Sequence, residues 1–361
     1  MTVTPLEVLI LRRIATTGPL NLADYMAECL LHPEHGYYTT REPFGTAGDF
    51  TTAPEISQMF GELLGLCLAQ YWLDLGRPAP FTLAEIGPGR GTLMADVLRA
   101  TARVPGFHAA AQVTLVEASP ALRARQRVTL GAHPVTWLDS AADLPETPLF
   151  LLANEFFDAL PIRQFTRATG GWEETVVTLR DGRLALARGP ALPIAALDHR
   201  LADTAPGEVV EICPAAIPVM SMLGERITRH GGVALILDYG DWHSRGDTFQ
   251  ALRNHAFTDP LADPGAADLT AHVDFAALAQ ATACPAAYTT QGALLVALGI
   301  EARAATLAQR LDGTALQAHI TATRRLTHPE EMGTLFKALA LHRPGTAPPP
   351  GFPPQSPRDM P

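Results

Sequence analysis

The segment FTLAEIGPGRGTL, at residues 81–93, carries the strongest indication of the fold. Its first six residues form a β-like apolar run, three alternate glycines follow, and a helical pattern begins at Thr92. Glycine allows backbone angles that other residues avoid and lets a ligand approach the main chain. The helix that follows would direct its free N–H groups at that ligand. The stretch therefore predicts a strand, a ligand-binding loop and a helix.

Apolar runs and helical stretches alternate on both sides of this loop. The runs span residues 81–86, 112–117, 135–138, 149–153 and 232–238, with helical patterns at 92–101 and 120–130 between them. Short, continuous apolar runs are typical of strands that are covered on both faces. Strand–helix alternation of this kind indicates a parallel sheet. We predict an α/β fold with a doubly wound, Rossmann-like sheet.

The remaining sequence predicts how the chain is divided. Residues 1–75 form an N-terminal helical region that we expect to cover the ligand site, and residues 76–342 form the core. The core carries two insertions, near 165–205 and 242–275. The first has Gly170-Gly171 and Asp181-Gly182 between β-prone residues, which is typical of hairpins. We expect the Pro-rich tail at 343–361 to be disordered.

Composition limits the classes of partner. The chain has 27 Lys and Arg against 37 Asp and Glu, a net charge of −10, which opposes a broad nucleic-acid surface. Four cysteines stand far apart without Cys/His spacing, so we expect neither a metal site nor disulfides. No apolar run reaches the roughly 20 residues that a membrane span needs. The start of the chain resembles neither a signal nor a transit peptide, and we expect a cytoplasmic protein.

The glycine loop favours S-adenosyl-L-methionine over a dinucleotide. Its spacing is G-x-G-x-G (Gly87, Gly89, Gly91), whereas a pyrophosphate-binding loop has G-x-G-x-x-G. Glu85 precedes the loop, where a carboxylate would repel a pyrophosphate but suit a sulfonium and an ammonium group. A nicotinamide-dependent oxidoreductase is therefore the weaker alternative.

The next strand ends supply further candidate cofactor residues. Glu117 ends the second run, where a carboxylate can accept both ribose hydroxyls. Asp139 ends the third run, where it could bind the adenine amine or cap a helix. The fourth run leads into NEFFDALP at residues 154–161, beside the expected switch-point crevice. Asn154 and the acids of that stretch can orient an N–H nucleophile, while the aromatic residues exclude water.

Several segments together resemble one known family. They are NLADYM (21–26), HGYY (35–38), GDFTTAPEISQ (48–58), FGEL (60–63), the 85–91 loop, 154–161, DYG (238–240), ADLTAHVDF (267–275), TQG (290–292) and MGTLFK (332–337). They look like the MidA-like S-adenosylmethionine-dependent methyltransferases, in that family's order, over nearly the whole chain except the tail.

This resemblance implies a seven-strand methyltransferase sheet with a smaller added region. It further implies S-adenosyl-L-methionine as donor and an arginine side chain of a partner protein as acceptor, with a respiratory complex I subunit as a candidate. It also implies that Thr52, Pro54, Glu55 and Asn154 bind the cofactor. The oligomeric state stays open.

An arginine acceptor requires help from acidic side chains. Its pKa exceeds about 12, so the cation is a poor nucleophile, and paired carboxylates can orient the planar group and localise its charge. Glu155 and Asp158 are the first pair that we predict. Asp49 and Glu55 are the second, and Glu211 is a third candidate.

Two other interpretations remain. The NEFF stretch partly resembles the Asn-Pro-Pro-Phe loop of amide and adenine N-methyltransferases, although Glu155 replaces the first proline. The chain could also be a non-catalytic assembly factor that binds the cofactor, which the complete glycine loop disfavours.

Overall fold

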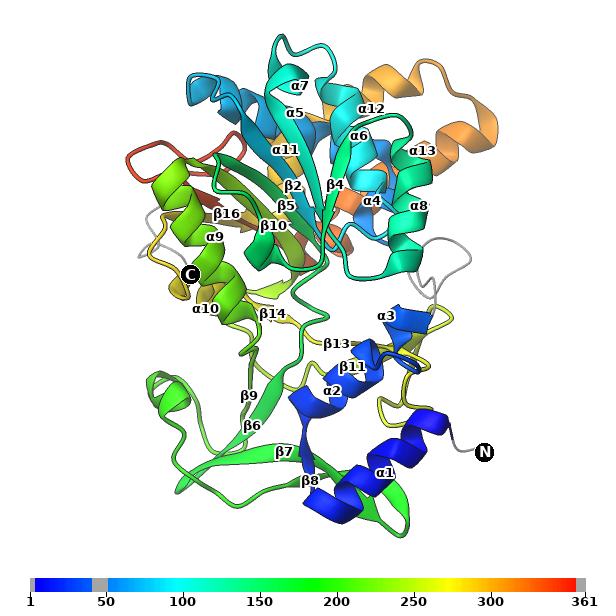
Figure 1. The fold of residues 1–361 in the computed structure, drawn as a ribbon, viewed down its shortest axis with the longest axis vertical. Helices are drawn as coiled ribbons and strands as arrows, with labels where there is room; N and C mark the ends of the chain where they lie inside the picture. Colours follow the sequence, from blue (N-terminus) through cyan, green and yellow to red (C-terminus); the bar gives the residue numbers. More distant parts are fainter. Residues whose placement is uncertain (1–3, 41–50, 355–361) are drawn as a thin grey trace. The chain divides into compact units, whose positions relative to one another are not determined.

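The structure is a computed structural model that describes residues 4–40 and 51–354 of the 361-residue chain (Figure 1). Two compact units are present. Unit 1 comprises Met1–Phe50, Asp158–Ile217 and His243–Asp274, and unit 2 comprises Thr51–Phe157, Pro218–Trp242 and Phe275–Pro361. The first fifty residues therefore group with the two segments that we expected as insertions. The division that we predicted from the sequence, at residues 75 and 342, differs from these two units and stays a prediction.

Seven strands of an eight-strand sheet form the main path of the sheet in unit 2. In spatial order its strands are β15 (Ala286–Thr290), β16 (Phe336–His342), β10 (Gly232–Asp241), β5 (Leu149–Asn154), β2 (Phe81–Ile86), β3 (Ala111–Val116) and β4 (Val135–Leu138). All run parallel except β16, which is antiparallel to both of its neighbours. The order reverses between β2 and β5, and ligands of such sheets bind outside the carboxyl ends of the strands at this switch point. The predicted α/β fold is confirmed.

The five predicted strands of this sheet are all present. The bounds of β2 and β4 match the expectation, and the other three differ by one to three residues. Every residue of β2 and β5 is buried, as continuous apolar runs predict for strands with helices on both faces. Strands β15 and β16 were not predicted.

Helices pack around this sheet. They are α4 (Ala53–Ile56), α5 (Gln58–Asp74), α6 (Thr92–Thr101), α7 (Phe107–Ala110), α8 (Pro120–Leu130), α9 (Ala216–His230), α10 (Phe275–Gln280), α11 (Gln291–Ala297), α12 (Ile300–Ala308), α13 (Gly313–Thr327) and α14 (Met332–Leu335). Within the described ranges no single helix has the length and apolarity to cross a membrane, and only the bent pair α11 and α12 meets that test jointly.

The start of the Pro-rich tail is ordered. Phe352 is 8% exposed and packs in the core of unit 2. The Cys67 thiol on α5 donates to the carbonyl of Pro350 at 3.3 Å. The disorder that we expected is therefore wrong for residues 343–354. The buried ring of Phe352 anchors this segment, although its Pro-rich composition alone indicates disorder.

Unit 1 is built on antiparallel strands. Its main sheet has the order β1 (Leu20–Asn21), β7 (Gly171–Arg180), β6 (Arg163–Ala168), β9 (Val209–Ile212), and β8 (Arg183–Arg188) also pairs with β7. The hairpins predicted around Gly170 and Gly182 are confirmed. A second sheet has the order β12 (Ala256–Thr258), β11 (Gln250–Arg253), β13 (Asp268–Thr270).

The described part of unit 1 also holds the helices α1 (Pro5–Thr17), α2 (Leu22–Leu31) and α3 (Tyr37–Thr40) and a 3-10 helix at Ala195–Leu201. Leu6, Ile10 and Ile14 recur at helical spacing on α1 and are buried. They join a core that includes Tyr25 and Met26 of α2. The pairing of β1 with β7 explains why the first segment of the chain belongs to unit 1.

Candidate functional site

The glycine loop has the conformation that its sequence demands. Gly87, Gly89 and Gly91 have φ angles of 65°, 48° and 81°, in the left-handed region where a side chain is strained. A Cβ atom at Gly87 would lie 3.0 Å from Cδ2 of Phe156. Gly91 is the N-cap of α6. The loop therefore presents main chain and a helix N-terminus at the carboxyl end of β2.

Glu85 is a buried acid at the end of β2. It is 3% exposed, and burial raises its pKa to about 8, partly offset by a hydrogen bond from the main chain of Met94. Among the described residues, its Oε2 atom has no hydrogen-bond partner. A buried carboxyl group whose charge is not compensated suits a ligand with positive charge.

Glu117 lies at the end of β3 with both oxygens engaged. Its Oε1 accepts from the main-chain N of Ser119 at 2.8 Å, and its Oε2 accepts from Nε2 of Gln126 at 3.3 Å. Burial raises the pKa of this carboxyl group, and these two donors oppose the rise. The predicted ribose residue thus stands at a strand end in a fixed orientation.

Asp139 follows β4 and is the most exposed of the predicted cofactor residues. Its side chain is 82% exposed, and its Oδ1 accepts from Nη2 of Arg123 at 2.6 Å. Arg123 also donates through Nε to the main-chain carbonyl of Glu117 at 2.6 Å. Arg123 would thus compete with an adenine amine for this carboxylate.

The loop after β5 is constrained at Glu155. This residue has a φ of 50°, which costs free energy for a residue other than glycine and is frequent at functional sites. Its Oε1 accepts from the main-chain N of Ala53 and from Nδ2 of Asn154, each at 3.1 Å. The carboxylate of Glu155 is therefore oriented by two donors.

The sequence analysis did not assign a role to Asp238, which fixes the same loop. Asp238 ends the fifth predicted run on β10 and is fully buried. Its Oδ2 accepts from the main-chain N of Phe156 and Phe157 at 3.2 and 3.0 Å, and its Oδ1 accepts from that of Tyr239 at 2.9 Å. An acidic residue at the end of an apolar run could have identified Asp238 from the sequence, because the same pattern selected Glu117.

The segment at residues 52–56 joins the site from the N-terminal side. Thr52 is the N-cap of α4, and Pro54 is buried in its first turn. Glu55 accepts from the hydroxyl of Thr92 on α6 at 2.6 Å and lies 3.6 Å from Nη1 of Arg90 in the glycine loop. Predicted cofactor residues from two distant segments are thus brought together at one loop.

Three further predicted acids are Asp49, Asp158 and Glu211. Asp49 lies outside the described residues. Asp158 belongs to unit 1, where it is 7% exposed and its carbonyl accepts from the main-chain N of Ala271. Glu211 also belongs to unit 1 and is bonded to Gln164 and Thr248.

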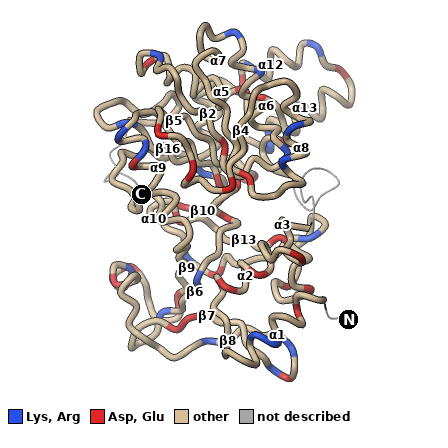
Figure 2. The backbone as a smooth tube through the Cα atoms, in the orientation of Figure 1, with Lys and Arg blue, Asp and Glu red and all other residues tan. Residues whose placement is uncertain are grey.

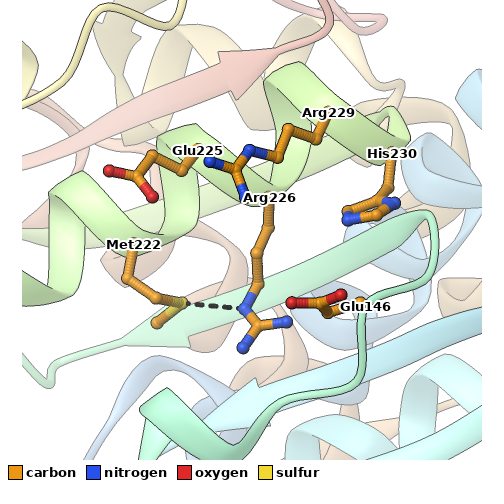
Figure 3. A pocket seen from close by; sticks show the side chains of 6 residues that line it. All are labelled: Glu146, Met222, Glu225, Arg226, Arg229 and His230. Carbon is orange, nitrogen blue, oxygen red and sulfur yellow. Dashed lines mark hydrogen bonds between the residues drawn. The ribbon is translucent and has the colours of Figure 1, made fainter.

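Charge and pockets add two observations within unit 2. Acidic residues gather where the strands of its sheet end, while basic residues are scattered over the helices (Figure 2). Figure 3 shows a pocket elsewhere, at the end of α9, where Nε of Arg226 donates to Sδ of Met222 at 3.2 Å. No predicted site residue lines it.

Within the described ranges, no group of three His, Cys, Asp or Glu side chains could hold a metal ion.

Comparison with known proteins identifies the family of the chain. Residues 63–293 match a family model described as "Putative S-adenosyl-L-methionine-dependent methyltransferase". The chain is 36% identical to "Protein arginine methyltransferase NDUFAF7, mitochondrial" of Bos taurus, over 94% of this chain and 84% of that protein. It is 36% identical to the Drosophila melanogaster homolog of that protein, over 91% of this chain and 83% of the homolog.

Solved structures agree. A COG1565 superfamily member from Burkholderia thailandensis, crystallised with S-adenosyl-homocysteine, has 30% identity and a TM-score of 0.81, covering 98% of this chain and 93% of that chain. A second crystal structure of a COG1565 superfamily protein from the same organism has 31% identity and a TM-score of 0.79, over 94% of this chain and 91% of that chain.

The relatives correct one expectation. The sequence led us to expect a cytoplasmic protein, but the similar curated proteins are mitochondrial by name, and this finding overturns the expectation. The prediction rested on the residue types at the start of the chain, and these do not decide the compartment.

Proposed function

Since the chain belongs to this family of S-adenosyl-L-methionine-dependent methyltransferases, we propose that it methylates an arginine side chain of a partner protein. The observation that carries the proposal is the carboxylate of Glu155, oriented on a left-handed residue beside the glycine loop. The names of the curated relatives support arginine as the acceptor. A subunit of respiratory complex I is the candidate partner, following the family resemblance.

The residues at the carboxyl ends of β2, β3 and β5 fit the cofactor. S-adenosyl-L-methionine supplies a methyl group on a positively charged sulfur when it is bound. The unpartnered oxygen of buried Glu85 suits positive charge, and the glycine main chain leaves room at Gly87 that a Cβ atom would take. In our proposal Glu117 binds the ribose hydroxyls and Asn154 lies beside the methionine part. Asp139, Thr52, Pro54 and Glu55 complete the set.

Glu155 would act on the acceptor. Methyl transfer is an in-line displacement, so the protein mainly aligns the nucleophile with the methyl group. A carboxylate that bonds one edge of the guanidinium orients it and draws its charge away from the attacking nitrogen. The donors from Ala53 and Asn154 fix the carboxylate for this task. Asp158 and Asp49 stay predictions from the sequence.

The test is transfer of a labelled methyl group. The protein is incubated with methyl-labelled S-adenosyl-L-methionine and extract from cells that lack it, and mass spectrometry locates the label. We expect label on an arginine of a single protein, and none with the Glu155→Gln variant. Label on another type of residue or on a small molecule would contradict the proposed acceptor. Cofactor binding without any label would favour a non-catalytic assembly factor.

A further inference from the structure

Gln126 is a fully buried amide that contacts three elements of the cofactor site. It lies on α8 and is 0% exposed. Its Nε2 donates to the carbonyl of Gly89 in the glycine loop at 2.8 Å and to Oε2 of Glu117 at 3.3 Å. Its Oε1 accepts from Nε1 of Trp137 on β4 at 2.8 Å. One side chain thereby connects the glycine loop, the end of β3 and strand β4.

These partners leave the amide one orientation. The indole nitrogen of Trp137 can only donate, so it must face the amide oxygen of Gln126. The amide nitrogen then faces a carbonyl and a carboxylate, which can only accept. The reverse orientation would oppose two donors at Trp137 and leave both acceptors without a proton. Trp137 is itself packed under the guanidinium of Arg127, which lies 4.5 Å from its ring centre.

The same amide fixes the carboxylate of Glu117. The Ser119 main-chain N bonds one oxygen and Gln126 bonds the other, so rotation of the carboxylate would break a hydrogen bond. Gln126 also packs against the loop, since a Cβ atom on Gly91 would lie 3.4 Å from its Cγ. A buried hydrogen bond to a charged group is among the stronger ones in proteins. This side chain therefore bridges the glycine loop and Glu117.

We propose that Gln126 is a positioning residue that orients Glu117 for the ribose hydroxyls and fixes its distance from the glycine loop. The inference deepens the proposed function, because it rests on Glu117 as the ribose-binding residue. Selectivity for a ligand with ribose hydroxyls would then depend on an amide that does not touch the ligand.

The test compares two ligands by calorimetry on the full chain. One is S-adenosyl-homocysteine and the other is its 2′,3′-dideoxy analogue, which lacks both ribose hydroxyls. We expect Gln126→Met to weaken binding of S-adenosyl-homocysteine about tenfold, as for loss of a hydrogen bond to a charged group. Binding of the analogue should stay as in the unchanged protein. The double variant Glu117→Gln/Gln126→Met should lose no more than Glu117→Gln alone.

Two further variants separate positioning from general damage to the fold. Trp137→Phe keeps Gln126 but removes the donor that orients its amide, so it should show a smaller loss with the same dependence on the hydroxyls. Gln291→Leu removes another fully buried glutamine of unit 2, which bonds the carbonyl of Leu326, and should leave the ligand preference unchanged.

An equal loss for both ligands in Gln126→Met would overturn the proposal, since the role would then be structural. Unchanged affinity in Glu117→Gln would overturn it as well, by removing the ribose residue. Failure of the labelling experiment leaves this test intact, because it measures binding and needs no acceptor.

Discussion

The two units bury acidic side chains in different settings. In unit 2, Glu85 and Glu117 lie at the ends of β2 and β3, and Asp238 lies on β10 just past its last parallel pair with β5. In unit 1, Glu211 lies within an antiparallel sheet, on β9 opposite Gln164 of β6. All four carboxylates are largely withdrawn from water, but their surroundings give them different uses.

Both carboxylate oxygens of Glu211 are engaged within unit 1. Its Oε1 accepts from Nε2 of Gln164 at 2.9 Å and from the main-chain N of Thr248 at 3.1 Å, and the Thr248 hydroxyl donates to Oε2. Gln164 in turn accepts from the hydroxyl of Thr175 at 2.8 Å. Burial raises the pKa of Glu211, and these donors oppose the rise. These hydrogen bonds stabilise the fold of unit 1.

The difference follows from the direction of the strands. Parallel strands send all their carboxyl ends to one edge, so residues far apart in sequence meet there next to helix N-termini. Antiparallel strands alternate, and a polar residue within them must find its partners across the sheet. A buried acid at a parallel strand end is therefore the better functional candidate.

The largest effect should come from the glycine loop. We expect Gly89→Val to abolish binding of S-adenosyl-homocysteine, because a β-branched side chain is strained at a φ of 48° and would occupy the ligand's approach. Calorimetry measures the affinity. Gly131→Val is the matched control, at a φ of 59° with no atom within 4 Å of its Cβ. Binding by Gly89→Val equal to that of the control would be incompatible with our assignment of the loop.

The second effect concerns Glu155. We expect Glu155→Gln to lower kcat for methyl transfer by about 100-fold or more, as for loss of a preorganised electrostatic contact, while the affinity for S-adenosyl-homocysteine is kept. Steady-state kinetics and calorimetry check this. Glu330→Gln, at a side chain that is 83% exposed, is the control. Full activity of Glu155→Gln would remove this residue from the mechanism.

The third effect concerns the support of that loop. Asp238→Asn replaces one acceptor oxygen by a donor, so a main-chain N–H of Phe156, Phe157 or Tyr239 loses its partner. We expect a loss of about 1–3 kcal/mol in the free energy of unfolding and a lower kcat. Urea denaturation and kinetics measure both. If stability fell while kcat did not change, the bond to this loop would have no part in catalysis.

The fourth effect tests the contrast itself. Glu211→Gln in unit 1 should lower the free energy of unfolding by about 1–3 kcal/mol through its lost hydrogen bonds, with no change in affinity for S-adenosyl-homocysteine. Denaturation and calorimetry on one preparation give both values. A change in affinity without a change in stability would reverse the roles that we give to the two units.

A further effect is a pH dependence of stability. The pKa of Glu85 is raised from 4.5 to about 8 in the folded protein. The folded state therefore retains a proton that the unfolded state loses, and this stabilisation, complete below about pH 4.5, is lost as the pH rises through about 8. Urea denaturation across this range should show a steeper decline for the unchanged protein than for Glu85→Gln. Parallel curves would mean that Glu85 does not titrate in this way.

The sequence predicted unit 2 well because its signals are local. Strand β2 and helix α6 are bounded by the glycines, and α8 begins at Pro120 after the Ser119 N-cap, whose side chain accepts from the main-chain N of Leu122. Strands β15 and β16 were missed because their pairing depends on contacts with each other and with β10.

The hairpins of unit 1 were predicted, but the pairing of its distant segments and the roles of two site residues were not. The main sheet of unit 1 joins Leu20 to Val177, a pairing that no local pattern reveals. Gln126 looks like an ordinary residue of an amphipathic helix, and only its partners on three other elements give it a role. Asp238 was visible as a strand-end acid within a family motif, but its partners were not.

The most direct test of the cofactor site is a crystal structure of the chain with S-adenosyl-homocysteine. Our account predicts the ribose hydroxyls against the Glu117 carboxylate and the homocysteine part over the Gly87–Gly91 main chain. Ligand bound away from the carboxyl ends of β2 and β3, with Glu117 and the glycine loop not in contact with it, would contradict the account.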